Sequence, residues 1–209
     1  VYEIARDEMP NASISISHQV SPAMREYQRT STTVANAYVQ PITSNYLERI
    51  QSGLARAGLN APLNVMLSSG GTTDIETATR FPIRLVESGP SGGALAGVYW
   101  GKQNGFNDIF AFDMGGTTAK AILTHKSELS VTSVSEVAHV HRFKRGSGLP
   151  LLVPMIEMIE IGAGGGSVAH VNNLGLPAVG PESAGSTPGP ACYARGGANP
   201  TVTDADLLI

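Results

Sequence analysis

Hydrophobic and polar residues alternate along this chain in short runs typical of strands, interrupted by two longer stretches with a helical pattern. The runs of strand type occupy residues 1–5, 14–17, 63–67, 109–112, 119–123 and 129–134. Residues 41–57 have the helical pattern, with these apolar positions on one face: Ile42, Tyr46, Leu47, Ile50 and Leu54. Gly58 follows as a helix stop, and a second helical stretch continues to about Asn104. The pattern predicts a chain built from both helices and strands.

The strands predicted on either side of residues 113–118 flank a turn that carries a carboxylate, two glycines and two threonines. The glycines permit backbone angles in which successive N–H groups converge on an oxyanion, and the threonines add hydroxyl donors. The carboxylate at the strand end can hold a hydrated Mg²⁺ beside phosphate oxygens. We predict a phosphate-binding hairpin; the alternative is an ordinary Gly-Gly turn with an acid that only ends a strand. The residues concerned are Asp113, Gly115, Gly116, Thr117 and Thr118.

Other loops are also rich in residues that shape the backbone. Residues 68–73 follow a predicted strand, where α/β sheets bind ligands. Residues 87–94 either bring a helix N-terminus close to an anion or allow tight helix packing. Three consecutive glycines within residues 162–167 let a flat ligand, a phosphate or a second backbone lie directly against the chain. Residues 179–197 combine glycine and proline so densely that they predict a loop of defined shape.

Composition narrows the class of protein. The 209 residues suffice for one large domain or two small ones, and a hydrophobic content of 42% supports a core. A net charge of -3 with scattered Lys and Arg does not predict binding to nucleic acid or to an anionic membrane. No apolar stretch reaches the roughly 20 residues of a membrane span, and we expect no signal peptide. The single cysteine excludes an internal disulfide, and we expect a cytoplasmic protein.

Several reactive side chains invite a functional interpretation that their surroundings do not support. His139 and His141 could offer two nitrogens to a metal, but no Cys or carboxylate ligand lies near them in the sequence, so we expect a solvated loop rather than a metal site. Cys192 has no visible histidine partner, and we expect it to be buried as a compact apolar residue. Asp204 and Asp206 are interpreted as cap or surface acids rather than catalytic ones.

Five motifs, in their order along the chain, resemble those of the hydantoinase A/oxoprolinase family: residues 113–118, 161–167, 180–185, 188–193 and 200–205. Residues 26–38 also resemble the family segment that leads into the helix. The resemblance covers nearly the whole chain. A lone Gly-Gly-Thr would be a weak signal, whereas five ordered motifs are a strong one.

The resemblance implies an α/β protein with an actin-like ATPase fold, in which two ribonuclease-H-like halves, each a mixed sheet with flanking helices, bind a nucleotide between them. This chain resembles the second half and would be a fragment of a larger two-lobed protein. Residues 1–209 would form one hydantoinase A/oxoprolinase domain, with a lead-in strand and helix at 1–60 and the nucleotide-binding half at 61–209. Such a half would expose an apolar face, so we expect weak solubility or self-association of the isolated chain.

The family activity implied is ATP-dependent hydrolysis of a cyclic amide, of the hydantoin or 5-oxoproline type, through a phosphorylated intermediate. Asp113 would then organise Mg²⁺ or another divalent cation, or orient the attacking water. The phosphates would be held by Gly115, Gly116, Thr117 and Thr118, and the nucleotide side of the cleft lined by Gly164, Gly165, Gly166 and Ser167. Lys120 stands where many relatives carry an acidic residue, and this departure changes the local charge.

Two other functions fit the same motifs. The nearer one is the alpha subunit of an ATP-dependent carboxylase of the acetone or acetophenone type, which uses bicarbonate and a ketone. The more distant one is a non-catalytic, actin-like nucleotide switch. Both enzyme interpretations imply a second subunit or fused domain of the hydantoinase B type as partner.

Overall fold

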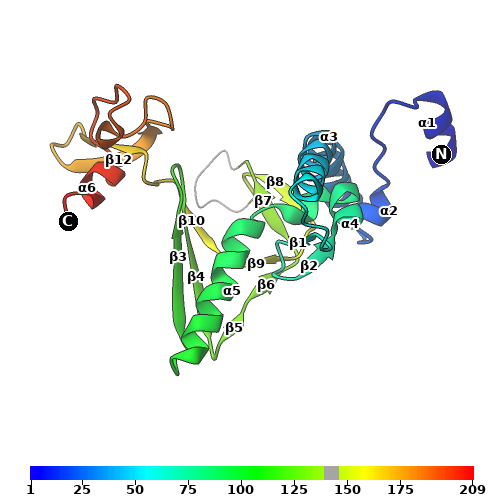
Figure 1. Cartoon of the computed structure of the whole chain (residues 1–209), viewed down its shortest axis with the longest axis horizontal. Helices are drawn as coiled ribbons and strands as arrows, with labels where there is room; N and C mark the ends of the chain where they lie inside the picture. Colours follow the sequence, from blue (N-terminus) through cyan, green and yellow to red (C-terminus); the bar gives the residue numbers. More distant parts are fainter. Residues whose placement is uncertain (139–145) are drawn as a thin grey trace. The chain divides into compact units, whose positions relative to one another are not determined.

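The computed structural model describes residues 1–138 and 146–209 (Figure 1). Contacts between residues divide the chain into two compact units. The first unit comprises Val1–Leu95 and Ser130–Glu157, and the second comprises Ala96–Leu129 and Met158–Ile209. Each unit combines helices with strands, which confirms the class of structure predicted from the sequence pattern.

The first unit contains most of the helices: α1 (Tyr2–Glu8), α2 (Ser17–Val20), α3 (Glu26–Arg56), α4 (Ile75–Arg80) and the 3-10 helix η1 (Pro82–Leu85). The strand predicted at residues 1–5 is wrong, because the Ala5 N–H bonds the Val1 carbonyl within a helix. The strand predicted at residues 14–17 is also wrong. The Ile16 carbonyl accepts from the N–H groups of the following turn, which starts α2 instead of a strand ladder.

Helix α3 begins 15 residues before the predicted start at residue 41 and carries Pro41 in its interior. Its first half has no apolar stripe, because the residues that it buries there are polar: Thr32 and Asn36 are both 0% exposed. In the second half Leu47 is buried as predicted, but Ile42 and Tyr46 of the predicted apolar face are exposed. Gly58, with a φ of 78°, follows the helix as the predicted stop.

Three antiparallel strand pairs complete the first unit: β1 (Asn64–Met66) with β2 (Thr72–Asp74), β6 (Val131–Thr132) with β9 (Met155–Ile156), and β7 (Ser135–Val137) with β8 (Leu149–Leu151). The strand predicted at 63–67 is confirmed as β1, and residues 68–71 form the loop to β2. A small core of buried residues joins helices to strands: Val20, Ile83, Leu151 and Val153.

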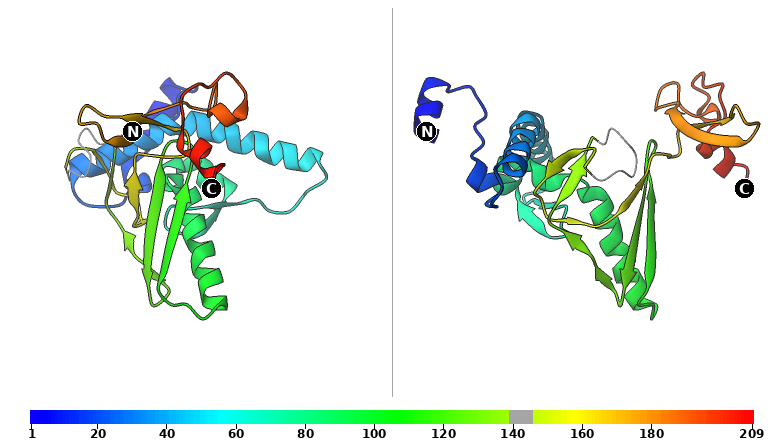
Figure 2. Two further views of the ribbon diagram at one scale, coloured as in Figure 1. Left: turned by 90° about the vertical axis from the view of Figure 1, so that its left-hand side faces the viewer. Right: turned by 180° about the vertical axis from the view of Figure 1, so that it is seen from behind.

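The second unit is built on a four-stranded sheet of β3 (Ile109–Met114), β4 (Ala119–His125), β5 (Glu128–Leu129) and β10 (Ile159–Ile161). The predicted hairpin is confirmed, since β3 and β4 pair antiparallel from Ile109↔Thr124 to Met114↔Ala119 (Figure 2). All strand pairs among the described residues are antiparallel, so the mixed sheet is not present in that part of the chain. The single strand predicted at 129–134 is instead two short strands, β5 and β6, interrupted at Ser130.

Helix α5 (Ser88–Gln103) starts within the glycine-rich cluster predicted to precede it. Small residues on this helix allow close contact with β3, because a Cβ on Gly97 would lie 3.3 Å from the Ala111 side chain. A Cβ on Gly101 would overlap the Ile109 side chain. Tight packing therefore explains the small residues of the helix within the second unit.

A second ribbon and two short helices form the C-terminal part of the same unit: β11 (Ser167–Val171), β12 (Pro177–Ser183), the 3-10 helix η2 (Ala191–Tyr193) and α6 (Val202–Asp206). Thr201 caps α6, since its side chain accepts from the Asp204 N–H while the Asp204 carboxylate accepts from the Thr201 N–H. None of the helices in the described ranges is long and apolar enough to span a membrane.

Candidate functional site

The hairpin between β3 and β4 places the predicted phosphate-binding residues at one tip. Asp113 is the penultimate residue of β3 and is exposed. The turn beyond it closes through the Gly115 N–H, which donates to the Thr118 carbonyl at 2.9 Å. The carboxylate, the two glycines and the two threonines therefore lie together on one turn, as the sequence predicts.

The glycine-rich loop before β11 packs directly against this tip. The Gly165 N–H donates to the Gly115 carbonyl at 2.9 Å, and the Gly166 N–H donates to the Gly116 carbonyl at 2.8 Å. A Cβ on Gly164 would lie 2.5 Å from the Gly115 carbonyl oxygen. The sequence left open whether a flat ligand, a phosphate or a second backbone lies against these glycines, and in the structure a second backbone does.

This packing determines the direction of the N–H groups at the tip. In a trans peptide the carbonyl and the N–H point to opposite sides. The Gly115 and Gly116 carbonyls point toward the glycine loop, so the N–H groups of the same two peptides, those of Gly116 and Thr117, point away from it. Within the described ranges, the N–H groups of Gly116, Thr117 and Thr118 have no hydrogen-bond acceptor. Successive N–H groups of this kind form an anion-binding concavity.

The C-terminal part of the unit holds the glycine loop in place. Thr203 of α6 donates to the Gly165 carbonyl twice, from its N–H at 2.8 Å and from its hydroxyl at 2.9 Å. Ser167, predicted to line a nucleotide, is 1% exposed, and its hydroxyl oxygen accepts from the Gly164 N–H at 2.9 Å. The supporting role of Thr203 was not predicted, although it lies in the fifth motif, residues 200–205.

Lys120 lies beside the hairpin tip on β4, in cross-strand register with Asp113 of β3 and Glu160 of β10. Its Nζ donates to the Thr118 hydroxyl at 2.6 Å and lies 3.3 Å from a Glu160 carboxylate oxygen. The side chain is only 14% exposed. The ammonium group is thus held next to the turn, and Glu160 offsets part of its charge.

Asp204 is a structural acid, as predicted. Its carboxylate accepts from the N–H groups of Ala191 and Cys192 and from the N–H and hydroxyl of Thr201. These hydrogen bonds, above all those from Cys192, hold the pKa of Asp204 well below its ordinary value. The carboxylate therefore fastens η2 to the start of α6.

The burial predicted for Cys192 is wrong, because the residue is exposed on η2. A hydrogen bond with the Asp204 carboxylate, together with partial desolvation and the negative charge of that carboxylate, raises the pKa of the thiol. A raised pKa keeps the thiol protonated near neutral pH and disfavours its use as a nucleophile.

The remaining metal candidates give no second site. His139 and His141 lie outside the described residues. Within residues 1–138 and 146–209, no group of three or more His, Cys, Asp or Glu side chains is arranged to hold a metal ion. Asp113 is a carboxylate at the end of β3 beside the candidate anion site, and Glu160 is a second one, in register with Lys120.

Comparison with known proteins identifies similar sequences along nearly the whole chain. The family model of hydantoinase/oxoprolinase matches residues 29–209. Caprolactamase subunit alpha of Pseudomonas jessenii is 37% identical over 99% of this chain and 28% of its own length. Acetophenone carboxylase gamma subunit of Aromatoleum aromaticum is 34% identical over 100% of this chain and 28% of its own. The 5-oxoprolinase of Saccharomyces cerevisiae is 33% identical over 100% of this chain and 15% of its own length.

Two solved structures share this arrangement of elements. The ATP-dependent caprolactamase from Pseudomonas jessenii superposes with a TM-score of 0.73 at 36% identity, over 98% of this chain and 28% of that one. A nucleotide-free acetone carboxylase superposes with a TM-score of 0.73 at 26% identity, over 92% of this chain and 26% of that one. The chain therefore spans less than a third of the length of these relatives.

Proposed function

The chain belongs to the hydantoinase/oxoprolinase family, and from this we propose that it is part of an enzyme that hydrolyses a cyclic amide at the expense of ATP. Relatives named caprolactamase and 5-oxoprolinase support this proposal, because caprolactam and 5-oxoproline are both cyclic amides. The proposal concerns the whole protein, because the caprolactamase relative is more than three times as long as this chain.

The observation that carries the proposal is the row of three N–H groups at the tip of the β3–β4 hairpin. Gly116, Thr117 and Thr118 present them without an acceptor in the described part of the chain. A triphosphate offers oxygens that such groups bind, and the Lys120 ammonium, paired with Glu160, lies beside the turn. An ATP phosphate bound at this tip therefore fits the donors that the chain provides.

A divalent cation such as Mg²⁺ also fits this site. Asp113 is exposed at the end of β3, next to the proposed phosphate position. Mg²⁺ is commonly held by one or two carboxylates, with phosphate oxygens and water as the other ligands. Asp113 would hold the cation, or it would orient the water that attacks.

The chemistry proposed is activation of the amide by phosphorylation. Transfer of the terminal phosphoryl group of ATP to the amide oxygen releases ADP and makes the adjacent carbon electrophilic. Water would then add to that carbon, the phosphate would leave as inorganic phosphate, and the ring C–N bond would break as the nitrogen takes up a proton. The hairpin N–H groups would stabilise charge on the phosphoryl oxygens during transfer. Gly164, Gly165, Gly166 and Ser167 are buried against the turn, so they would contribute by fixing the direction of those groups.

A second candidate function is that of a carboxylase subunit. The similarity to acetophenone carboxylase gamma subunit and to the acetone carboxylase structure favours this alternative. In that case the same hairpin would hold ATP for activation of bicarbonate or a ketone. Either reaction would need a partner, and we propose a subunit or domain of the hydantoinase B type, because two of the relatives are named as subunits.

The test is phosphate release by the intact protein with its partner subunit, measured with 5-oxoproline, hydantoin, caprolactam, or acetone plus bicarbonate. Stimulation by one cyclic amide, lost in Asp113→Ala, is the expected result. The control is Asp206→Asn, a change of an exposed acid on α6, which should keep the activity. Stimulation only by acetone plus bicarbonate would select the carboxylase alternative, and turnover that survives Asp113→Ala would contradict the proposed site.

A further inference from the structure

The first unit contains a pocket of about 260 Å³ whose lining residues all belong to that unit. Leu67, Leu152 and Val153 form apolar walls, and three polar residues, Ser21, Ser69 and Arg84, also line it. Pockets for drug-sized ligands begin at about 300 Å³. The pocket therefore suits a small molecule with an apolar body and a polar group.

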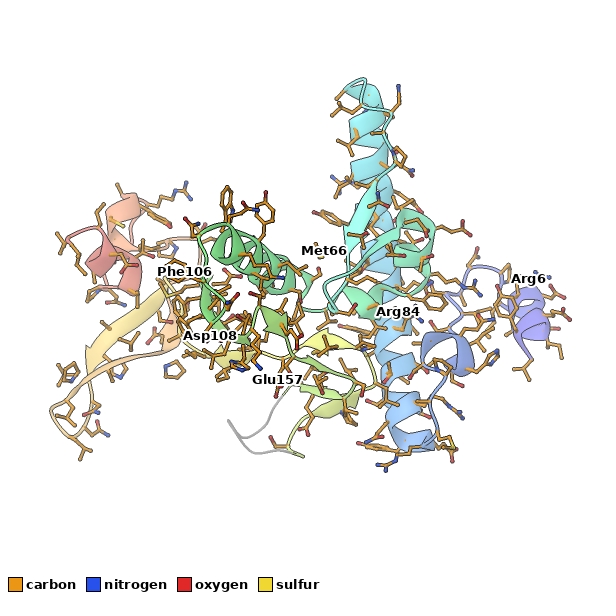
Figure 3. The ribbon with its side chains drawn as sticks, turned by 90° about the horizontal axis from the view of Figure 1, so that it is seen from below. Arg6, Met66, Arg84, Phe106, Asp108 and Glu157 are labelled. Atoms are coloured by element: carbon orange, nitrogen blue, oxygen red, sulfur yellow. The ribbon has the colours of Figure 1, made fainter. Side chains whose placement is uncertain are left out.

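Arg84 supplies a positive charge at this pocket. It lies on η1, which packs against α3 (Figure 3). Its Nη2 donates to the carbonyls of Gln19 and Val20 at a long 3.4 Å, and its Nε and Nη1 have no acceptor in the described ranges. Three of its five N–H donors thus remain available to an acceptor.

A second cation strengthens the positive charge. The guanidinium groups of Arg84 and Arg80 lie over the ring of Phe81, at 4.6 and 5.1 Å from its centroid. No carboxylate pairs with either guanidinium in the part of the chain that the structure describes. Of the two arginines, Arg84 is the one that lines the pocket, while Arg80 donates to the Gln19 side chain.

Ser21 contributes a hydroxyl to the pocket. The residue is 4% exposed and lines the pocket beside Arg84. Ser69, in the loop that follows β1, adds a second hydroxyl to the same pocket.

We propose that this pocket binds the carboxylate of a small organic acid. Arg84 and the hydroxyls of Ser21 and Ser69 would donate to the carboxylate oxygens, while Leu67, Leu152 and Val153 contact the apolar body. A single guanidinium with a planar fork suits a carboxylate, and the apolar walls disfavour a free phosphate. The loop at residues 68–73, which takes no part in the proposed hairpin site, would contribute Ser69 to this pocket.

The test is calorimetric titration of the intact protein, without nucleotide, with cyclopentanecarboxylate and with the neutral cyclopentanecarboxamide. We expect the acid to bind at least tenfold more tightly than the amide, and Arg84→Met to weaken acid binding at least tenfold. The matched control is Arg49→Met, an exposed arginine of α3, which should bind like the wild type. Equal binding of acid and amide, or no binding of the acid, would overturn the proposal.

Ser21→Ala guards against a variant that merely unfolds. Loss of this one hydroxyl should change the thermal midpoint little, while acid binding weakens several-fold. Unchanged acid binding in both Ser21→Ala and Arg84→Met would contradict the proposed contacts. Because the titration omits ATP and can be repeated in Asp113→Ala, its outcome is independent of the proposed ATP reaction.

Discussion

At the scale of single residues, the site depends on positions where no side chain can be present. A Cβ on Gly164 would lie 2.5 Å from the Gly115 carbonyl oxygen and 2.7 Å from the Thr117 nitrogen, closer than real contacts allow. Both neighbours are backbone atoms of the hairpin turn, which cannot rotate away as a long side chain could. The glycine is therefore required by the hairpin, before any ligand is considered.

Gly164→Ala should destabilise the protein by about 1–3 kcal/mol, because the added methyl group forces the loop and the hairpin apart. The measurement is the midpoint of thermal unfolding. Gly116→Ala, on the same hairpin, is the matched comparison, since a Cβ there meets nothing within 4 Å. Equal loss of stability in the two variants would show that steric contact with the hairpin is not the cause.

Asp204 gives the protein an acid-sensitive contact. Hydrogen bonds hold the pKa of its carboxyl below the ordinary value of 3.8, so the carboxylate stabilises the fold above that pH. This contribution should decline as the pH falls below 3.8, because protonation removes acceptors for Cys192 and Thr201. The measurement is the thermal midpoint from pH 7 down to about pH 2, because the loss begins near 3.8 and continues toward the lowered pKa of the folded state. In Asp204→Asn the thermal midpoint should fall less steeply as the pH is lowered, and an unchanged pH dependence would contradict this role. Asp206→Asn is the control and should keep the pH dependence of the wild type.

Individual residues of the hairpin could be predicted from the sequence because glycine, threonine and aspartate there act through local backbone geometry. Asp113 and Thr118 lie where the strand and turn pattern places them. The supporting contact from Thr203 could not be predicted, since it joins segments 38 residues apart. Cys192 was wrongly expected to be buried, because burial depends on what packs over a loop and not on the composition of that loop.

At the scale of elements, α3 is positioned by polar contacts more than by an apolar stripe. The side chain of Asn36 is fully buried, donates to the Arg80 carbonyl at 3.2 Å and accepts from the Ile83 N–H at 3.2 Å. The Thr32 hydroxyl accepts from the Leu152 N–H at 2.8 Å. These two residues link α3 to η1, α4 and the segment after β8.

Asn36→Ala should lower the free energy of unfolding by about 1–3 kcal/mol, because it leaves a buried carbonyl and a buried N–H without a partner. Urea denaturation of the variant measures this loss. Asn45→Ala is the control on the same helix: Asn45 is exposed, so its replacement should change stability by no more than about 0.5 kcal/mol. Comparable losses in the two variants would assign the effect to helix propensity instead.

The elements that sequence reasoning found were those with local signals. The hairpin strands, β1 and the stop at Gly58 follow from apolar runs and glycine. The start of α3 was missed because apolar periodicity is absent where Thr32 and Asn36 are the buried residues. The strand predicted at 1–5 is wrong because five residues, four of them apolar around Glu3, are compatible with a helix as well as with a strand.

At the scale of the whole molecule, the sheet of the second unit has one apolar face open to solvent. Cross-strand pairs share a face, so Phe110 opposite Leu123, and Phe112 and Ile159 opposite Ala121, all lie on the same side. Phe110 and Leu123 are 61% and 65% exposed. Small residues of α5 contact the other side, at Ile109 and Ala111.

The isolated chain should therefore self-associate through this face, because apolar patches of that kind are usually covered by protein. Light scattering after size-exclusion chromatography over a range of concentrations measures the association. Leu123→Lys should shift the chain toward monomer, since a charge in the centre of the face opposes its burial. Leu174→Lys introduces the same charge at a residue that is 82% exposed in the turn between β11 and β12, and should leave association unchanged. A monomeric wild-type chain at all concentrations would show that the face is stable in water, whereas equal effects of both variants would trace association to net charge.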